Sequence, residues 1–320
     1  MSKIAVIGAG FYGSYIALKL ADKGHKVILI DPEDKSSATL HCQARLHSGM
    51  FYVRSIKDLL SCARNFTKFL KIFKPYIYSE FNSYYLIDKN SKVDFDSYKN
   101  ICKETGLKTK EVNLDYINSD SVQGILKTNE FSINTSELLF SLRDKCKNHH
   151  NITFIKDHAV SLKETDRVLI NLLYSDPITV NRCILASYGN NFKFLKDLGY
   201  QVPSFNNYKI PVIKFRDNLP RDCHAVVDGD FWSSISLKDY KLLTNKFNLG
   251  TENIWDKSLN LMKVYIPELE AELIQIDTVE KYVLTNSREA QITRYGNIYT
   301  VFSGKLTNIF DIINQIENLE

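Results

Sequence analysis

The sequence predicts an α/β fold, in which a doubly wound, Rossmann-like domain is joined to a smaller mixed α+β domain. Residues 3–31 have the pattern of a strand, a glycine turn, a helix and a second strand, which is the βαβ unit of doubly wound sheets. From Tyr208 the pattern changes, and Ile210–Phe215 and Ala225–Val227 have the pattern of strands in a β-rich region. The length of 320 residues is enough for two domains.

The first element is an apolar strand, Lys3–Ile7, which runs into a turn with three glycines. Gly8 permits the tight turn, Gly10 lets the backbone approach a pyrophosphate, and Gly13 lets the following helix, Ser14–Lys23, lie close to the strand. The pyrophosphate would sit at the positive N-terminus of that helix. The residues expected to contact a dinucleotide here are Gly8, Gly10, Phe11, Tyr12 and Gly13.

The second strand, Val27–Ile30, ends in an acidic residue, Asp31, which lies 18 positions after Gly13. A carboxylate at this place can bond the two ribose hydroxyls of a dinucleotide. It also argues against NADP, because a 2′-phosphate would meet its negative charge. FAD and NAD both remain open on these residues alone.

Composition and charge indicate which partners to expect. The net charge of +4, from 41 basic and 37 acidic residues, is too mild to suggest nucleic-acid binding. No stretch approaches the ~20 apolar residues of a membrane-spanning helix, and the N-terminal residues fit a structural strand rather than a signal peptide. The six cysteines form no CxxC pair, so we expect free thiols in a cytoplasmic protein and no metal site.

A segment dense in polar side chains follows the acid. It contains His41, Gln43, Arg45, His47, Ser48, Tyr52 and Arg54. The spacing His47-Ser48-Gly49-x-x-Tyr52 resembles the segment after the second strand of L-2-hydroxyglutarate dehydrogenases and of FAD-dependent glycerol-3-phosphate dehydrogenases. Both belong to the D-amino-acid-oxidase-like superfamily. The resemblance implies FAD rather than NAD, with this loop, including Arg45 and His47, beside the flavin.

The middle of the chain alternates between helical and strand patterns. The helices expected are Leu59–Lys74, stopped by Pro75, then Phe95–Thr105, closed by Gly106, and Leu138–Lys147. The strands expected are Tyr84–Ile87, Ile152–Ile155 and a hairpin of Val168–Tyr174 with Ile178–Val180. Two later segments, Trp255–Tyr265 and Glu268–Ile274, also carry helical patterning.

Two further positions follow from the resemblance. In the family, a main-chain segment after the strand Ile152–Ile155 lies against the adenine, which implies a contact by Val160. The run Arg182–Gly189 resembles the family's strand that ends in a small-residue turn and a glycine under the FAD, which implies a contact by Gly189.

The C-terminal region carries a second signal. A strand, Asn297–Phe302, leads through a turn to a closing helix, Ile309–Leu319. The turn resembles the Gly-Gly-Lys-x-Thr-Thr segment of glycerol-3-phosphate dehydrogenases, with Ser303 in place of the first glycine and Asn308 in place of the second threonine. The resemblance implies that the helix N-terminus stabilises negative charge on the reduced flavin. The implied contacts are Gly304, Lys305, Leu306 and Thr307.

The resemblance implies the chemistry as well. It implies an FAD-dependent oxidoreductase that oxidises a CH–OH or CH–NH group of a small, anionic substrate by hydride transfer to flavin N5. His47 is the expected proton acceptor, because its ordinary pKa suits that role. Tyr52 would orient substrate, and Arg54 and Arg288 are candidate clamps, with Arg294 competing with Arg288.

The same resemblance implies the domain boundaries. The FAD-binding domain is expected from residues 1–75, 130–205 and 285–320, and the substrate domain from residues 76–129 and 206–284. Two alternatives stay open, namely an NAD-dependent dehydrogenase with the same fingerprint and a flavin-binding protein without catalysis. The sequence also leaves the substrate, the electron acceptor and the oligomeric state open.

Overall fold

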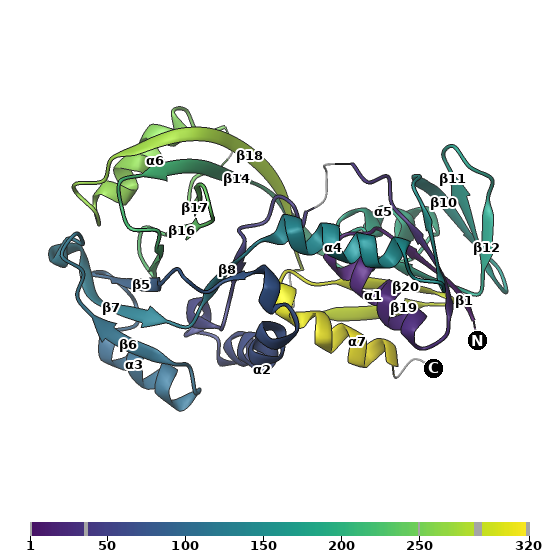
Figure 1. Ribbon diagram of the computed structural model, residues 1–320, viewed down its shortest axis with the longest axis horizontal. Helices are drawn as coiled ribbons and strands as arrows, with labels where there is room; N and C mark the ends of the chain where they lie inside the picture. The colour runs from purple at the N-terminus through teal and green to yellow at the C-terminus, as the bar shows by residue number, and fades with distance from the viewer. Residues whose placement is uncertain (1, 35–37, 249, 285–289, 318–320) are drawn as a thin grey trace. The chain divides into compact units, whose positions relative to one another are not determined.

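The computed structural model describes residues 2–34, 38–248, 250–284 and 290–317, and the chain forms two compact units (Figure 1). The first unit is built from Met1–Leu40, Thr135–Asn207 and Tyr282–Glu320, and the second from His41–Asn134 and Tyr208–Lys281. Within the described ranges, no helix is both long and apolar enough to cross a membrane.

The first unit contains a six-stranded sheet in the order β19-β20-β13-β1-β2-β9. Its five parallel strands are β1 (Lys3–Ile7), β2 (Lys26–Ile30), β9 (Ile152–Ile155), β13 (Arg182–Leu185) and β20 (Ile298–Phe302). The antiparallel edge strand is β19 (Gln291–Tyr295). Because β1 lies between β2 and β13, the glycine turn opens at the carboxyl edge of the sheet, where doubly wound folds bind ligands. The predicted Rossmann-like fold is confirmed.

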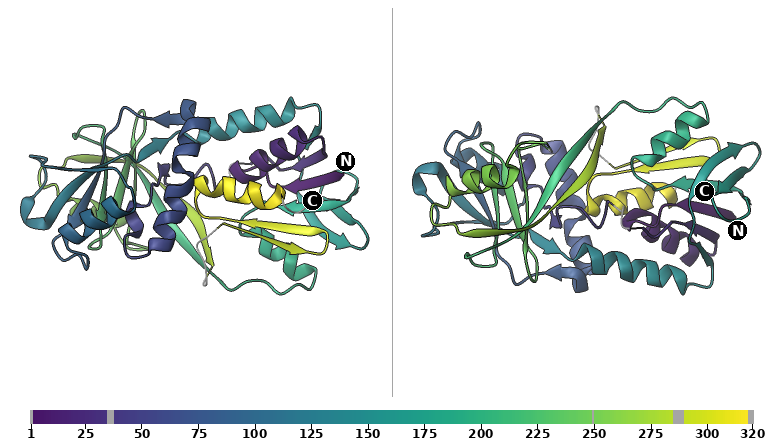
Figure 2. Two further views of the ribbon diagram at one scale, coloured as in Figure 1. Left: turned by 90° about the horizontal axis from the view of Figure 1, so that it is seen from below. Right: turned by 90° about the horizontal axis from the view of Figure 1, so that it is seen from above.

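The two faces of this sheet are covered by different layers. Helix α1 (Phe11–Asp22) packs against β1 and β2 and beside α4 (Thr135–Lys147) and α7 (Ile309–Glu317) (Figure 2). On the other face, apolar side chains of β1 and β2 pack against a three-stranded antiparallel sheet of β10 (Ala159–Glu164), β11 (Val168–Leu172) and β12 (Ile178–Val180). Helix α5 (Asn190–Asp197) lies on this second face. The predicted hairpin is therefore two strands of a three-stranded sheet.

The second unit is organised around an eight-stranded mixed sheet in the order β18-β14-β17-β16-β15-β5-β7-β6. The strands are β5 (Ser83–Asp88), β6 (Thr109–Val112), β7 (Val122–Thr128), β14 (Phe205–Asp217), β15 (Cys223–Val227), β16 (Trp232–Ser236), β17 (Lys241–Asn245) and β18 (Ala271–Leu284). A small sheet joins β3 (Arg45–Leu46), β8 (Phe131–Ile133) and β4 (Ile77–Tyr78). The helices are α2 (Ile56–Ile72), α3 (Phe95–Glu104) and α6 (Ile254–Lys263), with a 3₁₀ turn, η1, at Met50–Tyr52.

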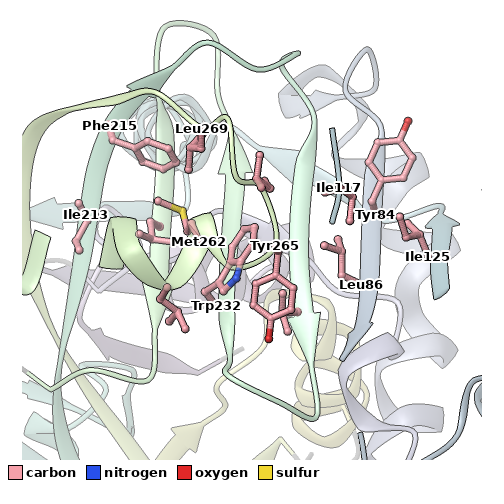
Figure 3. Close-up of a cluster of buried hydrophobic side chains, with 14 residues drawn as sticks. Tyr84, Leu86, Ile117, Ile125, Ile213, Phe215, Trp232, Met262, Tyr265 and Leu269 are labelled. Carbon is pink, nitrogen blue, oxygen red and sulfur yellow. The ribbon is translucent and has the colours of Figure 1, made fainter. Parts of the chain in front are cut away.

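Around β5 both faces of this larger sheet are buried, because alternate residues of β5 enter different cores. Tyr84 and Leu86 join a cluster with Trp232 and Met262, which Figure 3 shows. Tyr85 and Ile87 join a second cluster that includes residues of η1 and α3. The strand Ser83–Asp88 is therefore buried along its whole length.

Two sequence predictions differ from the structure. Residues 41–75 are predicted in the FAD-binding domain but lie in the second unit, because β3 pairs with β8 and Met50 and Leu59 enter the core that contains Tyr85. The predicted helix Glu268–Ile274 is wrong, because Ala271–Leu284 is the edge strand β18 beside β14. Pairing with a neighbouring strand overrides the local helical pattern there.

Candidate functional site

The glycine turn after β1 has the geometry that close approach requires. Gly8 has a φ of +100°, and a Cβ there would lie 2.8 Å from the carbonyl oxygen of Ala186. A Cβ on Gly13 would lie 1.7 Å from the carbonyl oxygen of Gly8, so only glycine allows α1 to start this close to β1. These two positions carry the packing roles that the sequence predicts for them.

The N-terminus of α1 is suited to an anion. Gly10 is the N-cap and has no side chain, and the first turn carries no acidic residue. The backbone N–H of Phe11 donates to Thr39 Oγ1 at 3.1 Å. The first-turn N–H groups and the positive end of the helix form the place where a pyrophosphate binds in this type of turn.

The acid at the end of β2 lies against the same turn. Asp31 Oδ2 accepts from the backbone N–H of Ala9 at 2.6 Å, and Oδ1 accepts from that of Glu33 at 2.8 Å. The carboxylate is therefore held beside the pyrophosphate turn, as a ribose-binding acid requires. The sequence missed a third partner, Arg143 of α4, whose Nη2 lies 3.0 Å from Oδ1.

The structure brings together the two sequence signals that lie at opposite ends of the chain. The hydroxyl of Tyr12, in the first turn of α1, donates to the carbonyl oxygen of Lys305 at 2.5 Å. Burial is the main cause that raises the pKa of Tyr12 well above its ordinary value, so the hydroxyl remains a donor. The segments that carry the N-terminal and C-terminal motifs therefore lie side by side in the first unit.

The C-terminal turn is open around Gly304. A Cβ built on Gly304 would have nothing within 4 Å among the described residues. Lys305 then starts the 3₁₀ turn η4 (Leu306–Asn308), which leads into α7, and this turn has no acidic residue in its first positions. Backbone N–H groups and open space at a helix start suit the electron-rich edge of a bound ring.

Two predicted cofactor contacts have other surroundings. Gly189 lies against the ring of Tyr282, and a Cβ there would come within 2.2 Å of it, so this glycine serves aromatic packing. Val160 lies on β10 with 41% of its surface exposed. Its neighbours in that strand belong to the three-stranded sheet.

A buried polar cluster in the second unit contains the predicted proton acceptor. Glu130, between β7 and β8, is 1% exposed and accepts from Ser48 N at 2.7 Å, Ser48 Oγ at 3.0 Å and Tyr85 OH at 2.5 Å. His47 Nδ1 lies 3.8 Å from Glu130 Oε2, and the His47 side chain is 21% exposed. A partly exposed imidazole thus lies beside a buried carboxylate.

Arg45 belongs to this cluster rather than to an open cofactor surface. Its side chain is 1% exposed, and Nη1 lies 3.3 Å from Glu130 Oε2. Its Nη2 donates to the carbonyl oxygens of His224 at 3.2 Å and Ser234 at 3.4 Å. These contacts correct the expectation that the Arg45 side chain binds cofactor, because its guanidinium donors are directed at protein groups.

Glu130 is ionised in this setting. Burial alone would raise the pKa of Glu130, but the charge on Arg45, and that on His47 when its imidazole is protonated, oppose it. Hydrogen bonds from Tyr85 and Ser48 act in the same direction, and together they hold the pKa of Glu130 below its ordinary value. The sequence analysis missed this residue, although an acid directly before the apolar strand Phe131–Ile133 was a usable signal.

The residues predicted to bind substrate have varied surroundings. Arg54 is exposed and forms an ion pair with Asp228 at 2.8 Å, so it would have to exchange partners to bind a substrate. Tyr52 lies in η1, where its N–H donates to the carbonyl oxygen of Gly49 at 2.8 Å. Arg288 lies outside the described residues. Arg294 is exposed on β19, where its Nε donates to the carbonyl oxygen of Gly296 at 2.8 Å.

Comparison with protein families gives one match that covers more than half of the chain. Residues 3–201 match the family model described as DAO, FAD dependent oxidoreductase. Among curated proteins, the FAD-dependent monooxygenase FPY4 of Fusarium mangiferae is 28% identical over 131 residues, which cover 38% of this chain and 34% of that protein. The aligned parts span about a quarter to a third of the length of the curated relatives.

Solved structures share the fold over nearly the whole chain. Glycine oxidase from Geobacillus kaustophilus has a TM-score of 0.80 at 10% identity, covering 97% of this chain and 91% of that chain. L-proline dehydrogenase from P. horikoshii has a TM-score of 0.78 at 14% identity, covering 98% and 91%. At these identities the likeness establishes the fold.

Proposed function

Because the chain belongs to the DAO family of FAD-dependent oxidoreductases, we propose that it oxidises a CH–NH or CH–OH group of a small, anionic substrate. The observation that carries the proposal is the pair formed by the accessible His47 imidazole and the buried Glu130 carboxylate. This pair supplies a proton acceptor with a fixed negative charge beside it. The cofactor supplies the electron acceptor.

FAD is the cofactor, so the alternative of an NAD-dependent dehydrogenase is set aside. The residues present fit it, since the glycine turn and the start of α1 suit the pyrophosphate and Asp31 suits the ribose. The open space beside Gly304 and the start of η4 suit the ring. When bound, FAD accepts the hydride that leaves the substrate carbon.

His47 is the residue that we propose to accept the substrate's proton. As the hydride leaves, the substrate nitrogen or oxygen must lose a proton, and an imidazole is well matched to that task. The Glu130 carboxylate would stabilise the resulting imidazolium, because opposite charges 3.8 Å apart attract. Arg45 works against this effect, since it neutralises part of the charge on Glu130.

An amino acid is the substrate class that we favour. The two solved structures compared above are described as acting on glycine and on L-proline, both of which carry a carboxylate next to an amine. Arg54 is the candidate partner for that carboxylate, because its side chain is 58% exposed and could leave Asp228. A hydroxy acid would present the same carboxylate beside a CH–OH group.

The experiment is an anaerobic screen in which the flavin absorbance of the purified protein is followed with amino acids and 2-hydroxy acids. We expect bleaching with at least one amino acid. His47→Ala should keep FAD and slow bleaching by about 100- to 10,000-fold. The matched control is His150→Ala, an exposed histidine of the first unit, which should behave as wild type.

Two outcomes would count against the proposal. Equal bleaching rates in His47→Ala and wild type would show that His47 accepts no proton in the reaction. A flavin that no amino or hydroxy acid bleaches, but that NADPH reduces, would instead favour the monooxygenase chemistry named for the curated relative. We also propose a cytoplasmic location, which the buried free thiols of Cys102, Cys146, Cys183 and Cys223 support.

A further inference from the structure

A buried arginine on α4 connects the glycine turn to the acid at the end of β2. Arg143 is 5% exposed, its Nε donates to the carbonyl oxygen of Ala9 at 2.8 Å, and its Nη2 donates to Asp31 Oδ1 at 3.0 Å. The planar guanidinium makes the two bonds from two separate nitrogens held in a fixed geometry, whereas a lysine has a single nitrogen. All of these residues lie in the first unit.

The hydrogen bonds to the Asp31 carboxylate determine how many of its acceptor sites a ligand can use. A carboxylate has about four acceptor sites, two on each oxygen. Oδ1 uses both of its sites, on Glu33 N at 2.8 Å and Arg143 Nη2 at 3.0 Å. Oδ2 uses one, on Ala9 N at 2.6 Å. Among the residues that the structure describes, one acceptor site on Oδ2 therefore remains, which is enough for one ribose hydroxyl rather than the two that the sequence predicts.

Helix α4 also contacts Glu33, the acidic residue that follows Asp31. Lys147, one turn after Arg143, forms an ion pair with Glu33 at 2.6 Å, and Glu33 has a left-handed φ of +57°. Lys147 differs from Arg143 in two respects. Its side chain is 44% exposed, and it forms an ion pair with Glu33 rather than with Asp31. Lys147 is therefore a matched control for the loss of one positive charge from this face of α4.

We propose that Arg143 is a positioning residue of the FAD site. It fixes Asp31 so that Oδ2 is the oxygen left to accept from one hydroxyl of the adenosine ribose. It also places a positive charge beside Asp31, which reduces the repulsion between that carboxylate and the pyrophosphate at the start of α1. This inference concerns FAD binding and holds whether or not His47 accepts a proton.

The test measures the dissociation constant of FAD by quenching of flavin fluorescence on titration into apoprotein. Arg143→Met should raise the constant by about 10- to 100-fold, the range expected when a charged hydrogen bond is lost. Lys147→Met should stay within about 2-fold of wild type, because exposed ion pairs contribute little. Asp31→Asn and the double variant Asp31→Asn/Arg143→Met complete a double-mutant cycle.

If Arg143 acts through Asp31, the double variant should bind FAD about as well as Asp31→Asn alone. If the two substitutions weaken FAD binding additively in the cycle, the proposal is overturned. Equal losses of FAD affinity in Arg143→Met and Lys147→Met would also overturn it. The melting temperature of each apoprotein is the control for folding. If Arg143→Met does not fold, Arg143→Lys replaces it and should bind FAD with intermediate affinity, since a lysine keeps the charge but has one nitrogen in place of the Nε and Nη2 pair. Wild-type affinity in Arg143→Lys would contradict the two-bond arrangement.

Discussion

Glu130→Gln removes the negative charge from the buried cluster of the second unit while keeping its size. Glu130 Oε1 accepts from Ser48 N at 2.7 Å, and Oε2 accepts from Tyr85 OH at 2.5 Å and lies 3.3 Å from Arg45 Nη1. A glutamine has one acceptor oxygen and one amide that only donates. Its nitrogen must therefore face either the Ser48 N–H or the Arg45 guanidinium, and neither can accept.

The variant also leaves Arg45 buried without its counter-charge. Removing one partner of a buried ion pair costs about 3–5 kcal/mol of the free energy of unfolding. At about 2–4 °C per kcal/mol for a domain of about 150–250 residues, the melting temperature should fall by roughly 6–20 °C. Thermal unfolding followed by circular dichroism at neutral pH measures it. A loss below about 1 kcal/mol, the value of an exposed pair, would refute the reasoning.

The control is the double variant Arg45→Met/Glu130→Gln. Replacing both charges of a buried pair with uncharged groups is often close to neutral, so the double variant should be more stable than Glu130→Gln. The pH dependence gives a second check. The pKa of Glu130 lies below its ordinary value of 4.5, so its ionised form contributes stability above about pH 4.5 and loses it as the pH falls through the lower folded value. The difference in the free energy of unfolding between wild type and Glu130→Gln should therefore become smaller in acid. A difference that does not change with pH would contradict an ionised Glu130.

Two predictions concern the cofactor unit. Gly13→Ala should lose FAD, because its Cβ would lie 1.7 Å from the carbonyl oxygen of Gly8 and would force α1 away from the turn; the flavin absorbance of the purified variant measures this, and full loading would disprove it. Lys305→Met should lower the reduction potential of bound FAD by roughly tens of millivolts, because it removes a positive charge from the turn before α7. Potentiometric titration of both proteins decides this second prediction, and equal potentials would show that Lys305 has no influence on the cofactor.

The sequence revealed those parts of the site that depend on local backbone geometry. Gly8 and Gly13 could be assigned because a strand, a turn and a helix within a few residues need glycine at these places. The confirmed cofactor followed from such local motifs and from the family resemblance. The helix predicted at Glu268–Ile274 overlaps the start of β18, whose partner β14 begins more than fifty residues earlier in the chain and so gives no local signal.

The residues that bond to the site from distant parts of the sequence could not be assigned in the same way. Arg143 meets Asp31 across 112 positions of sequence, and Glu130 meets Arg45 across 85. Each is one charged residue among many in the sequence, and only the three-dimensional fold gives it a partner. The hydrogen bond from Tyr12 to Lys305, across 293 positions, is of the same kind.

Each of the two units is built from separate segments of the chain, and this affects the order in which the units can finish folding during synthesis. Strand β1 needs β13 as its neighbour, and β13 needs β20, so the parallel sheet is incomplete until residues 298–302 have left the ribosome. The last segment of the second unit, which ends at Lys281, leaves earlier. Because ribosomes deliver about 5–20 residues per second and domains fold as units, the nascent chain has the strands of its second unit while β13 still awaits β20. The cofactor unit is thus the first to be started and the last to be finished.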